Sequence, residues 1–203
     1  LLMDPKVNII TLIGPAGTGK TMIALYAGLC QAVDDWHTVM PKQAQYSRLI
    51  VTRPIQPMGK DIGYLPGTLE EKMTPWVAPI NDNLQYLLGN GKDSLKEYVS
   101  EGIIEIEALT YIRGRSINNA FIVVDEIQNM TAHELKTVVT RVGDNSKIVL
   151  MGDIEQIDNV YIDETTNGLT HAVEKFKEHD LAGHVTLTRG ERSKVATLAA
   201  KIL

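Results

Sequence analysis

Residues 14–21 read GPAGTGKT, and this stretch constrains the chain more than any other. It has the spacing of a phosphate-binding loop, in which two glycines are followed by a lysine and a hydroxyl residue. Glycine tolerates positive φ, so such a loop can turn its backbone N–H groups inward around an anion. The residues predicted to bind a nucleotide are Gly14, Pro15, Ala16, Gly17, Thr18, Gly19, Lys20 and Thr21.

The sequence on either side of this loop favours the same interpretation. Val7–Ile13 is an apolar run typical of a buried strand, and Thr21–Val33 has the character of a helix. The N-terminus of a helix carries partial positive charge, which favours a bound phosphate. Lys20 is therefore expected to reach the β- and γ-phosphates, and the Thr21 hydroxyl to bind Mg²⁺. The alternative is a glycine-rich turn that matches the pattern by chance.

Strands and helices are expected to alternate along the rest of the chain, which predicts an α/β fold. Apolar runs predict strands at Ser47–Thr52, Ile103–Leu109, Ala120–Val124, Lys147–Met151 and Val185–Leu187. Capping boxes and amphipathic patterns predict helices at Thr68–Leu88, Ser94–Val99, Thr131–Val142, Thr170–Lys177 and Glu191–Leu203. The expected architecture is a three-layer αβα sandwich with a mostly parallel sheet, and residues 1–203 are interpreted as one domain. The glycine- and proline-rich stretch Ile55–Gly67 is expected to be a long functional loop.

Composition limits the class of protein. A hydrophobic content of 44% and a charged content of 22% are ordinary for a soluble globular protein. No apolar run approaches the roughly 18 residues that a membrane span needs, and no signal peptide is visible, so a cytoplasmic location without membrane contact is expected. The net charge of −5 argues against binding nucleic acid over the whole surface, but it allows a local basic groove. Cys30 is expected to be a buried structural thiol, and the start at Leu1 suggests a fragment of a longer protein.

Acidic and amide side chains follow two of the predicted strands. Asp125 and Glu126 come directly after Ala120–Val124, and Gln156 follows Lys147–Met151. Parallel strands present their carboxyl ends at one edge of a sheet, so these side chains are expected to converge on Lys20. Asp125 would contact Mg²⁺ through its waters, and Glu126 would polarise an attacking water. Gln156 would sense the γ-phosphate or align the water. The alternatives are a solvated acidic pair and a surface glutamine.

Arginines near other strand ends are candidates for binding phosphate. Arg192, preferred to Arg189, lies at a predicted strand–helix junction, where a guanidinium could contact a transferring phosphoryl group. Arg53, Arg113 and Arg115 could hold the phosphates of a nucleic acid or could equally solvate the surface.

Six motifs in this order resemble the PhoH-like ATPases, a P-loop family with a RecA-like core related to superfamily 1 helicases. The resemblance covers nearly the whole chain. It rests on the phosphate-binding loop, Arg53-Pro54 with Gly63–Gly67, Arg113–Ser116, Asp125–Asn129, Gly152–Asp158 and Gly190–Ser193. The last motif, with His184–Thr188 before it, is similar to the longer form in which an N-terminal PIN ribonuclease domain precedes the ATPase.

The resemblance implies roles for individual residues. It implies that Lys20 and Thr21 are the Walker A pair, that Asp125 and Glu126 are the Walker B pair, and that Gln156 is the motif-three glutamine. It also places Arg192 at the arginine-finger position. The family implies the cofactors ATP and Mg²⁺, ATP-dependent work on single-stranded RNA, and hexameric rings. The adenine-reading residues of the family normally precede the first strand and are not found here, so base selectivity is not predicted, and no PIN nuclease site is present.

The length of the chain bears on how a nucleotide would be enclosed. A superfamily 1 helicase closes ATP between two RecA-like cores, and 203 residues provide room for one. A neighbouring copy would then supply the second wall, which predicts a head-to-tail homo-hexamer with Arg192 acting in trans. Two other functions stay open: a P-loop kinase for a small molecule, and a nucleotide-dependent assembly switch without motor activity.

Overall fold

The computed structural model describes residues 1–34, 44–54, 69–89, 92–112 and 114–190. Four sequence predictions therefore lie outside the described residues. They are the loop at Ile55–Gly67, the capping box that begins at Thr68, the residue Arg113, and the C-terminal helix with Arg192.

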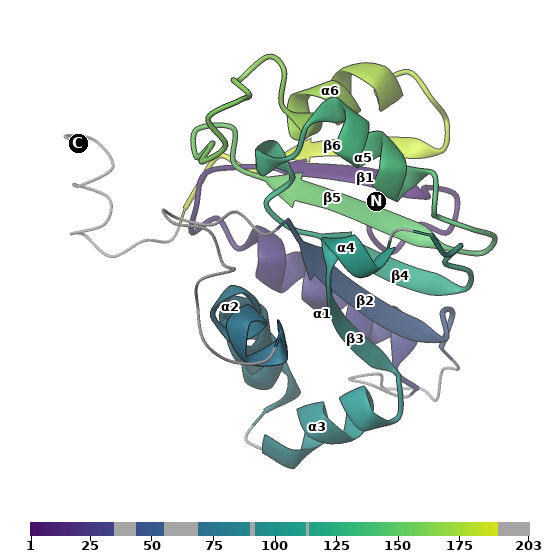
Figure 1. The fold of residues 1–203 in the computed structure, drawn as a ribbon. Helices are drawn as coiled ribbons and strands as arrows, with labels where there is room; N and C mark the ends of the chain where they lie inside the picture. Colours follow the sequence, from purple (N-terminus) through teal and green to yellow (C-terminus); the bar gives the residue numbers. More distant parts are fainter. Residues whose placement is uncertain (35–43, 55–68, 90–91, 113, 191–203) are drawn as a thin grey trace.

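The centre of the molecule is a six-stranded sheet in which every pair of neighbouring strands is parallel. The strand order is β3-β2-β4-β5-β1-β6, so β5 lies between β1, which leads into the phosphate-binding loop, and β4. The strands are β1 (Ile9–Ile13), β2 (Arg48–Arg53), β3 (Ile104–Ala108), β4 (Ala120–Val124), β5 (Lys147–Gly152) and β6 (Ala182–Thr186). Figure 1 shows their carboxyl ends along one edge of the sheet.

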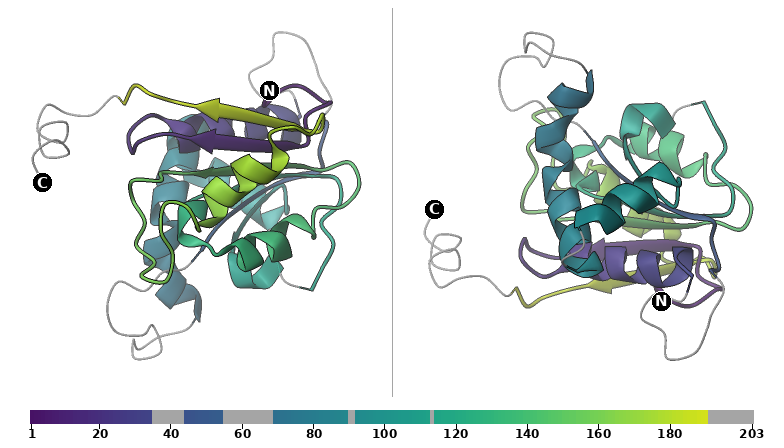
Figure 2. Two further views of the ribbon diagram at one scale, coloured as in Figure 1. Left: turned by 90° about the horizontal axis from the view of Figure 1, so that it is seen from above. Right: turned by 90° about the horizontal axis from the view of Figure 1, so that it is seen from below.

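Helices cover both faces of this sheet and complete the three layers (Figure 2). One face is covered by α1 (Lys20–Ala32), α2 (Leu69–Leu88) and α3 (Lys92–Ser100). The other is covered by α4 (Leu109–Ile112), the 3₁₀ turn η2 (Ile127–Asn129), α5 (Ala132–Val139) and α6 (Gly168–Phe176). The prediction of an α/β three-layer sandwich with a parallel sheet is confirmed. No helix within the described ranges has the length and apolar character needed to cross a membrane.

The central strands β4 and β5 are buried along their whole length because helices cover both faces of the sheet there. In β4, Phe121 and Val123 pack into the core beneath α1 and α2, whereas Ile122 and Val124 pack into the core beneath α5 and α6. All five residues of this strand are buried. It lies between β2 and β5 in the interior of the sheet, whereas β3, in which apolar and acidic residues alternate, lies at an edge.

Several element boundaries differ from the sequence predictions. The last strand is Ala182–Thr186 and not Val185–Leu187, because its register is set by pairing with β1 and not by its apolar content. Helix α6 begins two residues early because Asn167 caps it, its side chain accepting a hydrogen bond from the Thr170 N–H. Helix α5 ends at Val139 and not Val142. Cys30, expected to be buried, is only half-buried on α1.

Candidate nucleotide-binding site

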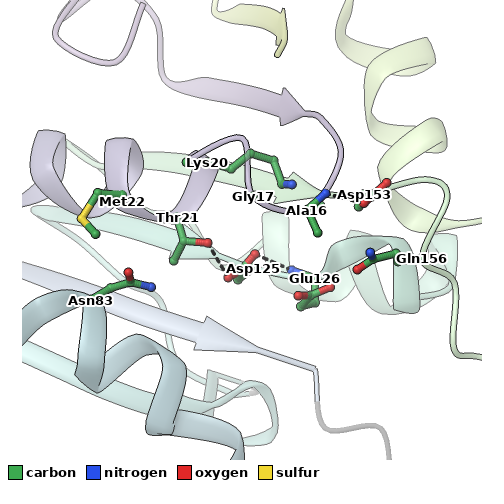
Figure 3. Close-up of a pocket in the computed structure, with 12 residues that line it drawn as sticks. Ala16, Gly17, Lys20, Thr21, Met22, Asn83, Asp125, Glu126, Asp153 and Gln156 are labelled. Carbon is green, nitrogen blue, oxygen red and sulfur yellow. Dashed lines mark hydrogen bonds between the residues drawn. The ribbon is translucent and has the colours of Figure 1, made fainter. Parts of the chain in front are cut away.

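A cavity of about 310 Å³ opens at the carboxyl edge of the sheet. Figure 3 shows that its walls come from the phosphate-binding loop, the start of α1, the ends of β4 and β5, and Asn83 of α2. The structure brings Lys20, Thr21, Asp125 and Glu126 to this cavity, and Gln156 lies at the same opening. The convergence expected from parallel strand ends is therefore present in the fold.

The backbone of the phosphate-binding loop has the conformation that its glycines allow. Gly17 and Gly19 each have a φ of 81°, and Gly19 forms the left-handed N-cap of α1. Gly14 is needed for a different reason, because a Cβ there would lie 2.7 Å from the backbone oxygen of Leu187. The start of α1, with its partial positive charge, therefore points into the cavity.

The Lys20 side chain is held close to the loop that precedes it. Only 8% of the residue is exposed, and its Nζ donates hydrogen bonds to the backbone oxygens of Gly14, at 2.5 Å, and Pro15, at 3.1 Å. These carbonyls fix the ammonium group over the loop, where the phosphates of a nucleotide would lie. The charge needed to bind them is thus in place without a large movement of the side chain.

Asp125 and Thr21 place oxygen atoms side by side at the base of the cavity. The Thr21 hydroxyl donates to Oδ2 of Asp125 at 3.1 Å, and Oδ1 of Asp125 accepts from the Glu126 N–H at 2.9 Å. Burial, and then the charge of Glu126, raise the pKa of the Asp125 carboxyl from 3.8 to about 6. A hydroxyl and a carboxylate are ligands that Mg²⁺ prefers, and a cation would offset the cost of burying this charge. The residues present therefore fit a magnesium ion.

Glu126 has an unusual backbone and a fixed side chain. Its φ of 57° is in the left-handed region, which turns the chain sharply from β4 into η2. One carboxylate oxygen accepts a hydrogen bond from Nε2 of Gln128 at 2.5 Å, and the other lies 4.0 Å from the guanidinium of Arg53. Left-handed backbone in a residue other than glycine is often found at functional sites. Arg53, predicted as a possible nucleic-acid ligand, thus lies beside the candidate base.

Gln128 was not singled out from the sequence, yet it connects the ends of β4 and β5. The residue is fully buried. Its amide donates to Glu126 and to the backbone oxygen of Gln156, at 3.0 Å, and accepts from the Asp153 N–H, at 3.2 Å. A Cβ at position 152 would lie 2.1 Å from its Oε1, so Gly152 makes room for it. The sequence feature that could have identified Gln128 is its position two residues after the predicted catalytic residue Glu126.

Asp153 was also missed as an individual residue. It is 5% exposed, and its Oδ2 accepts a hydrogen bond from the Ala16 N–H at 2.8 Å. The carboxylate therefore ties the phosphate-binding loop to the end of β5. Gln156 itself is exposed, and its position is set by its backbone contacts with Gln128 and Asp153.

The predicted arginines have different surroundings. Arg115 does not line the cavity, because its guanidinium pairs with Glu105 at 3.1 Å and with Glu107 at 2.7 Å on β3. Arg189 is exposed, and a Cβ at Gly190 would lie 3.4 Å from the backbone oxygen of Ala16. The chain therefore passes close to the phosphate-binding loop at Gly190. Arg113 and Arg192 lie outside the described residues.

Comparison with known proteins identifies relatives over the whole chain. The family model described as "PhoH-like protein" matches residues 2–202. "Protein PhoH2" of Bacillus subtilis is 53% identical over 205 residues, which is 100% of this chain and 45% of the relative. "Protein PhoH2" of Thermobispora bispora is 40% identical over 204 residues, 100% of this chain and 44% of the relative. The chain thus spans less than half the length of these curated relatives.

Solved structures with a similar fold are more distant. A helicase domain of Pyrococcus furiosus Hef matches with a TM-score of 0.47 and 11% identity, covering 91% of this chain and 36% of that structure. This likeness is too low to bear on function.

Proposed function

Since this chain belongs to the PhoH-like protein family, we propose that it is an ATPase that couples ATP hydrolysis to the movement or unwinding of single-stranded RNA. One observation carries the hydrolytic part of the proposal. Lys20, the pair formed by Thr21 and Asp125, and Glu126 surround a single cavity at the carboxyl edge of the sheet. A phosphate-binding loop, oxygen ligands for Mg²⁺ and a carboxylate able to activate water are the parts that phosphoryl transfer to water requires.

Each residue has a role that follows from its position. The N–H groups of the loop and the Lys20 ammonium would bind the phosphates, and Thr21 and Asp125 would hold Mg²⁺. When bound, Mg²⁺ neutralises charge on the phosphate oxygens. Glu126, held by Gln128, orients the attacking water and accepts its proton. Gln156 reports the state of the γ-phosphate to the loop that follows β5.

The RNA and the assembly are further parts of the proposal. We propose that Arg192 of one copy lies at the nucleotide of its neighbour in a hexameric ring, because the cavity opens at the edge of the sheet, where a neighbour can close it. Arg53 and Arg113 are the candidates for contacting RNA phosphates. Arg115 is a weaker candidate, since Glu105 and Glu107 offset its charge. The additional length of the relatives leaves room for another domain, for which a PIN ribonuclease domain is our proposal.

Phosphate release from ATP with Mg²⁺ tests the proposal when it is measured with and without single-stranded RNA, at low and moderate salt. Stimulation by RNA that weakens as salt rises is expected, because contacts to nucleic-acid phosphates release counterions. Hydrolysis that RNA leaves unchanged would favour the assembly switch. Transfer of labelled phosphate to a small molecule and not to water would favour the kinase.

A further inference from the structure

The connection from β5 to α6 carries an exposed apolar tip. Val160 and Tyr161 expose 86% and 90% of their surface, so neither packs against its own chain. In Figure 1 this connection projects from the carboxyl edge of the sheet at the upper left. Exposed apolar side chains that lie next to each other can mark a surface on which a partner docks. We call this pair the apolar tip.

The apolar tip is held in place from both sides. Before it, the side chain of Asn129 accepts from the Asp158 N–H at 2.7 Å, and the Asn159 side chain accepts from the Tyr161 N–H at 3.1 Å. After it, Oδ1 of Asp163 accepts hydrogen bonds from the backbone and side chains of Thr165 and Thr166. A surface ordered before binding loses less conformational entropy when a partner docks.

The surroundings of the apolar tip are acidic. Glu155, Asp158, Asp163 and Glu164 flank it, all exposed, and no lysine or arginine lies between Lys147 and Lys175. Such a loop repels the phosphates of RNA, so base stacking on Tyr161 is disfavoured. A partner with an apolar centre and a basic rim would match it.

A groove with an apolar floor and lysines at its rim lies between α5 and α6. Its volume is about 430 Å³, and its floor is apolar. Leu135, Val139 and Phe176 form part of the floor, and Lys136 and Lys175, both exposed, lie at the rim. None of the described residues that line it is a carboxylate. We call it the α5–α6 groove. Helices α5 and α6 cover one face of the sheet, whereas the connection that carries the apolar tip projects from an edge (Figure 1).

We infer that the apolar tip of one copy of this chain docks in the α5–α6 groove of the next copy. The apolar tip supplies apolar side chains within an acidic border, and the groove supplies an apolar floor within a basic one. Two different patches of one chain that bind each other form a head-to-tail contact, which closes into a ring when the rotation allows. The inference rests on the ring proposed above and names its contact surfaces.

This pairing would connect the interface to the nucleotide. Asn129 holds the loop that carries the apolar tip, and it follows Gln128, which contacts Glu126 and Gln156. A change at the γ-phosphate therefore reaches the docked tip through adjacent residues of η2.

Two variants test the pairing, with the mass of the protein measured by light scattering in the presence of a non-hydrolysable ATP analogue and Mg²⁺. The tip variant carries Val160→Ser and Tyr161→Ala, and the groove variant carries Lys136→Glu and Lys175→Glu. Since all four residues are exposed, both variants are expected to fold. Tyr86→Ala, at an exposed tyrosine on α2, and Lys6→Glu with Lys96→Glu, at exposed lysines elsewhere, are the matched controls.

The expected result is assembly of the wild type and the controls, and loss of assembly in each variant alone. An equal mixture of the two variants should form dimers and nothing larger, because each mixed pair retains one intact tip facing one intact groove. Variants that assemble like the wild type, a mixture that stays monomeric, or a monomeric wild type would overturn the inference. Unchanged mass with weaker RNA binding by the tip variant would make Tyr161 an RNA contact instead. Assembly as expected without ATP hydrolysis would contradict the proposed function but not the pairing.

Discussion

Asp125 is the residue whose charge is most constrained by the fold. It is buried beside another carboxylate, and its pKa is about 6 where an exposed aspartate has 3.8. Arg53 and the hydrogen bonds from Thr21 and the Glu126 N–H lower this pKa only in part. A cation bound beside this carboxylate would favour its ionised form and lower its pKa.

The stability of the metal-free protein should depend on pH through Asp125. Its pKa is higher in the folded chain than in the unfolded one, so the folded state binds more protons between pH 3.8 and about 6. The free energy of unfolding should therefore fall as pH rises through this window, by about 3 kcal/mol at most for this residue. Denaturant unfolding without nucleotide or Mg²⁺ measures it. Asp125→Asn should remove this part of the pH dependence, and an unchanged profile in that variant would contradict the assignment.

Glu126 should be needed for hydrolysis and not for binding. Glu126→Gln keeps the size of the side chain and its contact with Gln128, but it removes the proton acceptor. We expect phosphate release to fall by about 10²- to 10⁴-fold, with ATP retained on the protein. Filter binding of labelled ATP, beside phosphate release, measures both. Hydrolysis at the wild-type rate would show that another group activates the water.

How accurately the sequence predicts each helix or strand depends on how much of that element is buried. β4 and β5 were predicted within a residue because continuous apolar runs buried on both faces have few alternatives. β6 was misplaced because an edge strand takes its register from β1 and needs fewer apolar residues. The short α4 and the turn η2 carry no periodic signal of their own. The roles of Gln128 and Asp153 could not be predicted from the sequence, because their hydrogen bonds join segments that are distant in sequence.

The capping box of α5 is a local signal that the structure contains as predicted. The Thr131 hydroxyl accepts from the Glu134 N–H at 3.2 Å, and the Glu134 carboxylate accepts from the Thr131 N–H at 2.9 Å. Thr131→Ala should lower the free energy of unfolding by about 1 kcal/mol. Thr137→Ala, within the same helix, should have a much smaller effect, because its hydroxyl bonds only to the His133 carbonyl. Equal losses in the two variants would argue that the cap contributes nothing.

At the scale of the whole molecule, the cavity opens at the carboxyl edge of the sheet, and the proposed site includes a neighbouring copy that closes it. Lys20→Ala removes the phosphate contact and Arg192→Ala removes the proposed finger, so each variant alone should be inactive. If Arg192 acts in trans, an equal mixture should recover about a quarter of wild-type hydrolysis, since some sites combine an intact loop with an intact finger. Hydrolysis assays after mixing the subunits measure this. A mixture that stays inactive would assign Arg192 to the nucleotide of its own chain.

The proposed function requires that the residues lining the cavity beside Lys20 hydrolyse ATP. The most direct measurement is phosphate release from ATP with Mg²⁺ by the wild type and by Lys20→Ala, with the folding of both verified by circular dichroism. We expect steady turnover in the wild type that requires Mg²⁺ and is lost in the variant. Equal phosphate release by the two proteins, or none by a folded and assembled wild type, would contradict it.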